Sequence, residues 1–172
     1  MECCTKPWFF VNQDMVKYAK MLSPEKLSDV RVAKAIYQLV SGRFEIKLSS
    51  IRPWAFYRLQ PSCEIWNQGT QPPMKVVFVL LSMLYLTGRF EDAKLYSTTQ
   101  KYGIFTRPHY YVRLKVDEKR YDLDPLAYHT GKEFGERVGK VGAERDIPSI
   151  SHPCSQHLKI GDNVFHLCGL TP

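Results

Sequence analysis

The stretch from Pro73 to about Gly88 most constrains the fold, because it is apolar on nearly every side. Pro is favoured in the first turn of a helix, and Gly is a natural residue at its far end. Since a helix that is apolar all round has to be buried, the sequence predicts a core helix enclosed by the other elements. Its apolar residues are Met74, Val76, Val77, Phe78, Val79, Leu80, Leu81, Met83 and Leu84.

A second constraint is the alternating pattern from His109 to Asp124, which predicts two strands joined by a tight turn. If the turn is the pair 117–118, Val116 pairs with Lys119 and Asp124 lies opposite Tyr111. His109 and Asp124 are then diagonal neighbours on one face, a separation of roughly 7–8 Å that side chains can bridge. An imidazole and a carboxylate so placed are the base and the orienting acid of a nucleophilic triad. The plain alternative is a surface hairpin whose polar face carries both residues.

The remaining segments predict helices first and strands later. Asp14 is expected to cap a helix ending near Leu22, and a second helix is expected from Ser28 or Asp29 to Gly42. Residues 44–48 alternate like a short strand, 49–72 have the composition of a long loop, and 93–98 predict a strand followed by a loop over 100–108. A polar helix is expected around 132–145, before an irregular tail.

Composition bounds the class of protein. The chain has 172 residues, of which 44% are hydrophobic, and a formal net charge of +7. One domain spanning 1–172 is expected, with no secretory signal and no apolar run long enough to cross a membrane. Five cysteines, an odd number at irregular spacing, argue against a disulfide scaffold and predict a reducing, cytoplasmic location. The basic balance makes an anionic partner plausible.

The order of these segments resembles the transglutaminase-like superfamily, whose core is shared with papain-type cysteine proteases. The helix at 33–40 is similar to the family's second helix, and Gly69-Thr70 before the core helix is similar to its nucleophile region. His109-Tyr-Tyr-Val-Arg-Leu and Tyr121-Asp-Leu-Asp-Pro125 are similar to its His and Asp-Pro strands. The resemblance covers residues 15–130, leaves 131–172 as a C-terminal helix and tail, and implies an α+β fold in which N-terminal helices and a buried core helix pack on an antiparallel sheet.

The sequence departs from this family at the nucleophile. The family has a cysteine at the start of the core helix, where the helix terminus lowers the pKa of the thiol. Gln71 occupies the expected position here, or Pro73 if the helix is counted back from Gly88. Thr70 is a candidate hydroxyl, although N-capping explains it more simply. The resemblance therefore implies a degenerate or pseudoenzyme module, without a cofactor, that binds a peptide, protein or acidic ligand in the former cleft.

Two alternatives stay open. In the first, Cys63 serves as the nucleophile of an active cysteine hydrolase or acyltransferase, with His109 and Asp124 as base and orienting acid. In the second, the chain is a basic nucleic-acid-binding module. The residues expected to hold phosphates or stack on bases are then Arg107, Tyr111, Arg113 and Lys115, with Tyr110, Lys119 and Arg120 beside them.

The tail is rich in soft metal ligands, but their spacing matches no standard zinc finger. These ligands are His152, Cys154, His157, His166 and Cys168. No metal site is predicted, and whether the tail binds zinc stays open.

Overall fold

The computed structural model describes residues 11–46, 62–102, 105–139 and 144–146. Its elements, in chain order, are α1 (Gln13–Leu22), α2 (Asp29–Arg43), β1 (Glu45–Ile46), α3 (Ser62–Trp66), β2 (Thr70–Gln71), α4 (Pro73–Leu86), β3 (Lys94–Tyr102), β4 (Phe105–Val116), β5 (Lys119–Leu123), α5 (Pro125–His129) and β6 (Arg145–Asp146).

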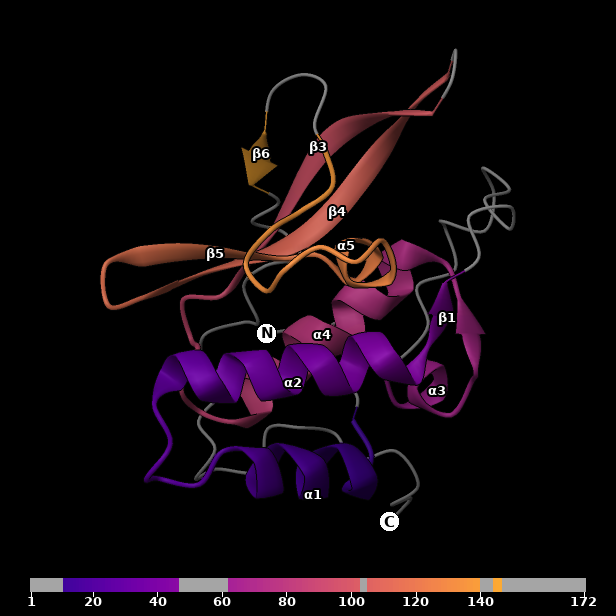
Figure 1. Cartoon of the computed structure of the whole chain (residues 1–172). Helices are drawn as coiled ribbons and strands as arrows, with labels where there is room; N and C mark the ends of the chain where they lie inside the picture. The colour runs from indigo at the N-terminus through magenta and orange to yellow at the C-terminus, as the bar shows by residue number, and fades with distance from the viewer. Residues whose placement is uncertain (1–10, 47–61, 103–104, 140–143, 147–172) are drawn as a thin grey trace, which may run out of the picture.

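Helix α4 is the predicted core helix. Every residue from Val76 to Leu86 is buried, because α1, α2 and α3 contact it along with β4 of the sheet. Figure 1 shows α4 between the helical layer of α1 and α2 and the sheet. The helix begins at Pro73, directly after Pro72, and ends before Gly88, whose φ of 72° only glycine adopts readily.

Helices α1 and α2 bury the stripes that their spacing predicts. The buried residues include Met15 and Ala19 in α1 and Val32, Ile36 and Val40 in α2. The cap of α1 differs from the prediction: Asn12, not Asp14, accepts the hydrogen bond from the backbone N–H of Met15. Asp14 lies two residues later, in the first turn, where the helix dipole favours its negative charge.

The sheet has the order β5-β4-β3-β6, and all its neighbouring strands are antiparallel. A separate parallel pair joins β1 to β2. Helices packed on one face of an antiparallel sheet make the fold α+β, as predicted. Residues of β4 alternate between two faces: Val112 and Leu114 belong to the core around α4, and His109, Tyr111 and Arg113 lie on the opposite side, which we call the His109 face.

Three expectations about local structure were wrong. Residues 62–66, expected in a loop, form α3. Strands β3 and β4 extend through most of the expected loop over 100–108, and His109 consequently lies within β4 instead of opening it. No helix is present over the described residues 132–139; positive φ angles at Gly131 and Gly135 bend the chain there.

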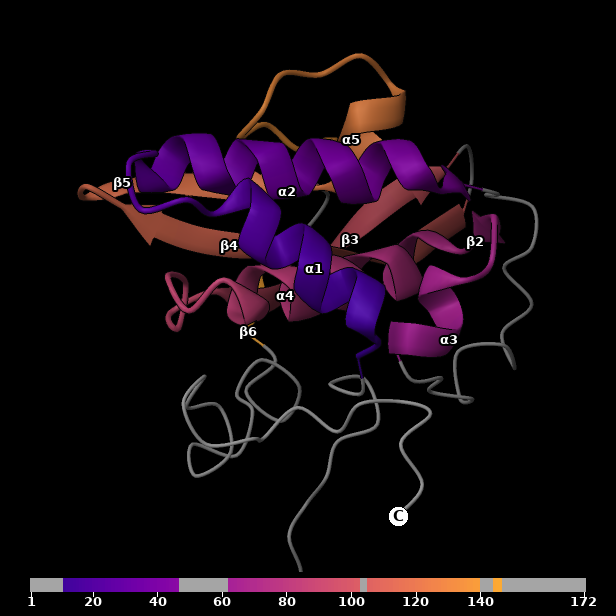
Figure 2. The ribbon, with the colours of Figure 1, turned by 90° about the horizontal axis from the view of Figure 1, so that it is seen from below.

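The chain after β5 instead covers the His109 face. Helix α5 packs beside α2 (Figure 2), and the chain then passes the edge of β5, where Gly135 accepts a hydrogen bond from the backbone N–H of Asp122. It reappears at the opposite edge of the sheet, where β6 pairs with β3. We call residues 130–139 and 144–146 the covering segment. None of the described helices is long and apolar enough to cross a membrane.

Candidate functional site

The β4–β5 hairpin has the predicted register. Asp117 and Glu118 have φ angles of 50° and 64°, which form a tight two-residue turn. Val116 pairs with Lys119, and Val112 pairs with Leu123. His109 and Asp124 therefore share a face, and the Nε2 atom of His109 lies 2.7 Å from the Oδ2 atom of Asp124. The structure thus brings together the two residues that the sequence singled out.

Asp124 is fully buried, and both its carboxylate oxygens accept hydrogen bonds inside the protein. Its Oδ1 atom accepts from the backbone N–H of Leu126 at 2.9 Å, and its Oδ2 atom also accepts from that of Val138 at 3.0 Å. The hydroxyl of Tyr37 donates to its backbone carbonyl at 2.8 Å. Burial, and then the nearby charge of Asp124, raise the pKa of Tyr37, so this hydroxyl stays protonated. Three hydrogen bonds hold the carboxylate in one position, and the fourth, from Tyr37, holds the backbone of Asp124.

His109 is 3% exposed, and its Nε2–H donates to the carboxylate. In the neutral imidazole this bond fixes the tautomer, because the other nitrogen, Nδ1, then carries the lone pair. Nδ1 has no hydrogen-bond partner among the described residues. An orienting acid on one ring nitrogen and an available lone pair on the other is the arrangement in which an imidazole acts as a general base.

The start of α4 follows directly after the β1–β2 pair, which contains Gln71. Gln71 is 3% exposed and pairs with Ile46 across the β1–β2 ladder. Ile46 in turn packs against the cluster that contains Leu126 and Val138, the two residues whose backbone amides bind Asp124. The side-chain amide of Gln71 donates to the Oε1 atom of Gln68 at 2.5 Å.

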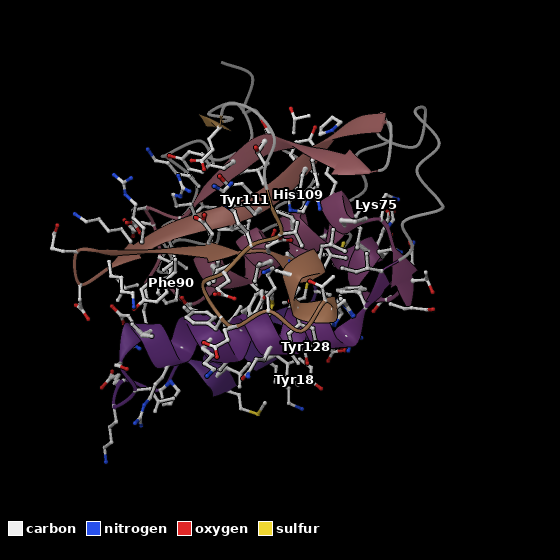
Figure 3. All side chains as sticks on the ribbon, turned by 45° about the horizontal axis from the view of Figure 1, so that its top comes forward. Tyr18, Lys75, Phe90, His109, Tyr111 and Tyr128 are labelled. Carbon is white, nitrogen blue, oxygen red and sulfur yellow. The ribbon has the colours of Figure 1, made fainter. Side chains whose placement is uncertain are left out.

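No thiol or capping hydroxyl occupies the start of α4. Its N-cap is Pro72, which makes no side-chain cap bond. Thr70 is exposed and donates to a carboxylate oxygen of Glu45 at 3.1 Å, so the expected N-cap role of Thr70 was wrong. Lys75 lies in the first turn (Figure 3), where burial lowers the pKa of its ammonium group and the charge of Glu64 opposes that shift.

Cys63 lies in α3, is 3% exposed and is disulfide-bonded. A sulfur in a disulfide has no thiolate with which to attack an acyl carbon. Cys63 is therefore not a nucleophile in this state of the protein. The other four cysteines, Cys3, Cys4, Cys154 and Cys168, lie outside the described residues, as do the tail histidines. Within the described part of the chain, no group of three potential metal ligands occurs.

Two of the residues proposed to contact nucleic acid, Tyr111 and Arg113, are engaged inside the protein, whereas Lys115, Lys119 and Arg120 are exposed. Tyr111 is fully buried and cannot stack on a base. Arg113 forms a two-point ion pair with Asp122, with its Nε atom 2.7 Å from one carboxylate oxygen and its Nη2 atom 2.9 Å from the other. Lys115 is half exposed and pairs with Glu118 at 2.6 Å. The side chain of Arg107 lies outside the described part.

Arg113 belongs to a closed ring of four charges. It also binds Glu144 at 2.8 Å, while Arg137 binds Asp122 at 3.0 Å and the other oxygen of Glu144. The hydrogen bonds to Asp122 raise the pKa of Arg113 despite its partial burial. Both guanidinium groups lie over the ring of Tyr111, at 5.5 Å and 4.8 Å from its centre. This ring of four charges, formed by Arg113, Asp122, Arg137 and Glu144, fastens the covering segment to the sheet.

Sequence reasoning missed the residues that enclose the pair. Val138 and Arg137 come from a segment expected to be helical, and Tyr37 comes from α2, in which no site residue was predicted. Thr98 is the Cα partner of His109 on β3. Extending the predicted 93–98 strand past its expected end would have placed Thr98, because Tyr96 and Thr98 then lie opposite alternate residues of β4, Tyr111 and His109.

No family model, curated protein or solved structure matches this chain.

Proposed function

We propose that this chain is a transglutaminase-like domain that lacks the catalytic cysteine and works as a ligand-binding module. The observation that carries this proposal is the His109–Asp124 pair, which keeps a base-and-acid geometry, while the start of α4 has Gln71 and two prolines in place of a thiol. The pair and Gln71 line the site, and the ligand is a peptide, a protein segment or an acidic molecule.

The lack of a competent nucleophile at the start of α4 and at Cys63, the one cysteine in the described part of the chain, supports binding over catalysis. An amide side chain and a proline cannot attack an acyl carbon, and the one described cysteine is already in a disulfide. Without its nucleophile, an enzyme of the triad type loses a factor of about 10⁶ in turnover. We therefore expect neither peptidase nor transamidase turnover from the purified protein. Turnover that disappears in the His109→Ala variant would contradict the proposal.

A restored cysteine tests the inherited geometry directly. In the Gln71→Cys variant, the thiol stands where the family has its nucleophile, and we expect His109 to lower its pKa from about 8.5 to roughly 6.5 or below. The measurement is the pH midpoint of iodoacetamide labelling at residue 71, followed by peptide mass spectrometry. The pH midpoint is compared, and not the labelling rate, because burial of residue 71 slows access of the reagent equally at every pH.

Two controls make this test decisive. Gln68→Cys places a thiol on the exposed part of the same loop, where an ordinary pKa is expected. The double variant Gln71→Cys with His109→Ala removes the base and should return the midpoint to the ordinary value. If Gln71→Cys labels with the same midpoint as Gln68→Cys, the start of α4 does not face the imidazole, and the transglutaminase-like interpretation fails.

An active enzyme that uses Cys63 remains the second candidate only if the disulfide is reduced. A cytoplasmic location, predicted from the cysteine count, would favour the reduced form, whereas a disulfide is typical of an oxidising compartment. No observation on the described residues favours nucleic-acid binding, because the aromatic and the arginine expected at its centre are occupied inside the protein.

A further inference from the structure

Three buried polar atoms on the His109 face have no hydrogen-bond partner among the described residues. They are the Oγ1 atom of Thr98, the phenolic oxygen of Tyr111 and the Nη1 atom of Arg137. Native proteins pair nearly all buried polar groups, so several unpaired ones on a single face need an explanation. The only other such atoms in the described part belong to Ser41 and Trp66, neither of which is on this sheet.

The three groups are neighbours around His109. Thr98 lies directly opposite His109 on the adjacent strand. The rings of His109 and Tyr111 stack with their centres 6.5 Å apart, and Figure 3 shows them side by side on β4. The guanidinium carbon of Arg137 lies 4.8 Å from the centre of the Tyr111 ring. One continuous strip of the face therefore holds all three.

All three groups can donate hydrogen bonds. The Nη1 atom of Arg137 carries two N–H groups, and the other nitrogens of this guanidinium are already bound to Asp122 and Glu144. Burial raises the pKa of Tyr111 to about 12, so its hydroxyl is a neutral donor at physiological pH. The hydroxyl of Thr98 donates or accepts. A set of donors of this kind is complementary to oxygen atoms that only accept, and it repels metal cations.

A carboxylate fits these donors better than a single carbonyl does. It offers two oxygens with about four lone-pair sites, whereas an amide carbonyl offers one oxygen. The two arginines of the four-charge ring balance its two acids, and the chain as a whole carries a net charge of +7, although the buried carboxylate of Asp124 also lies beside His109. An anion entering this strip thus meets an unsatisfied guanidinium N–H in a positively charged protein.

We propose that Thr98, Tyr111 and Arg137 form a binding site for a carboxylate group beside His109, enclosed between the sheet and the covering segment. This inference rests on the proposed function in taking the His109 face as a ligand site, and it names the ligand's chemistry. The ligand is either a small free acid or the acidic side chain of a peptide, and both present the same group.

The test is a titration of the full chain with sodium acetate. Binding is monitored by the nuclear magnetic resonance chemical shifts of the backbone amides in β3, β4 and the covering segment. Sodium chloride at equal ionic strength corrects for screening. A probe this small is expected to bind with a dissociation constant on the order of millimolar. Thr98→Val and Tyr111→Phe each remove one donor and keep the shape of the side chain, and each should weaken acetate binding about tenfold.

Stability separates this role from a structural one. Because the two hydroxyls have no partner in the folded protein, their removal should leave the urea midpoint unchanged or raise it. Tyr121→Phe is the matched control: Tyr121 pairs with Leu114 and packs on the core side of the sheet, so its affinity for acetate should be that of the parent. A lower urea midpoint together with unchanged affinity in Thr98→Val and Tyr111→Phe would overturn the proposal.

Two further probes define the ligand. Acetamide has the shape of acetate without its charge, and equal or tighter binding of acetamide would overturn the assignment to a carboxylate. N-acetyl-aspartate amide carries the same group on a blocked amino acid; its binding assigns a peptide side chain, and binding of acetate alone assigns a small acid. Absence of shifts with both acids overturns the site. The Gln71→Cys labelling midpoint is independent of these results, so the two proposals can fail separately.

Discussion

Removal of the Asp124 carboxylate should be the most damaging single change at the site. In Asp124→Ala, three donors inside the protein lose their acceptor: the Nε2–H of His109 and the backbone N–H groups of Leu126 and Val138. The bond from His109 to an ionised acid contributes about 1.5–3 kcal/mol. The bond from Leu126 caps α5 and contributes about 1 kcal/mol, as does the bond from buried Val138.

The sum predicts a loss of about 3.5–5 kcal/mol from the free energy of unfolding, against a total of roughly 5–15 kcal/mol for a domain. Asp124→Asn keeps one acceptor oxygen and should lose about half as much. The measurement is urea denaturation followed by far-ultraviolet circular dichroism. Glu91→Ala, an exposed acid with no described contact, is the control and should change stability by less than about 0.5 kcal/mol. A loss below about 1 kcal/mol in Asp124→Ala would refute the account of Asp124 as the anchor of the site.

Two other outcomes test the surroundings of the pair. Without reductant, Cys63 should resist iodoacetamide in native and in unfolded protein, and it should label after reduction and unfolding; labelling of unreduced protein in urea would show that the disulfide is absent. Gly135→Ala should destabilise the protein by about 1–2 kcal/mol in urea, because Gly135 has a φ of 89° and a new Cβ atom would lie 3.0 Å from the ring of Tyr121. Gly139→Ala, which meets nothing within 4 Å, is the control, and equal stability of the two variants would contradict this expectation.

The hairpin was predictable because its information is local. Alternation assigns each residue of β4 to a face, and the position of the turn then fixes the register, so His109 and Asp124 could be paired without any tertiary knowledge. The core helix was predictable for a similar reason, since an apolar surface on all sides has only one environment in which it is stable.

The covering segment was not predictable in the same way. Its charges alternate in a manner that suits an exposed polar helix, and the pattern alone does not reveal that Arg137 and Glu144 pair with Asp122 and Arg113 on the sheet. The positive φ angles at Gly131 and Gly135 give the physical reason why the helix does not form. Three glycines between 131 and 139 were the available signal, because glycine weakens a helix at each interior position.

The bonds that orient His109 also hold the fold together, and this fact limits what the pair alone says about function. Asp124 ties α2, α5 and the covering segment to the sheet, so a chain without a nucleophile still has a structural reason to keep it. The imidazole makes one hydrogen bond among the described residues, to the acid, and otherwise stacks on the ring of Tyr111. His109→Gln keeps a side-chain N–H that can donate to Asp124 and removes the lone pair of Nδ1. We therefore expect His109→Gln to lose no more than about 1–2 kcal/mol in urea. In combination with Gln71→Cys, it should return the labelling midpoint of the new thiol to that of the Gln68→Cys control. If the midpoint instead stays low, the thiol is activated by the end of α4 alone, and the imidazole takes no part in the site.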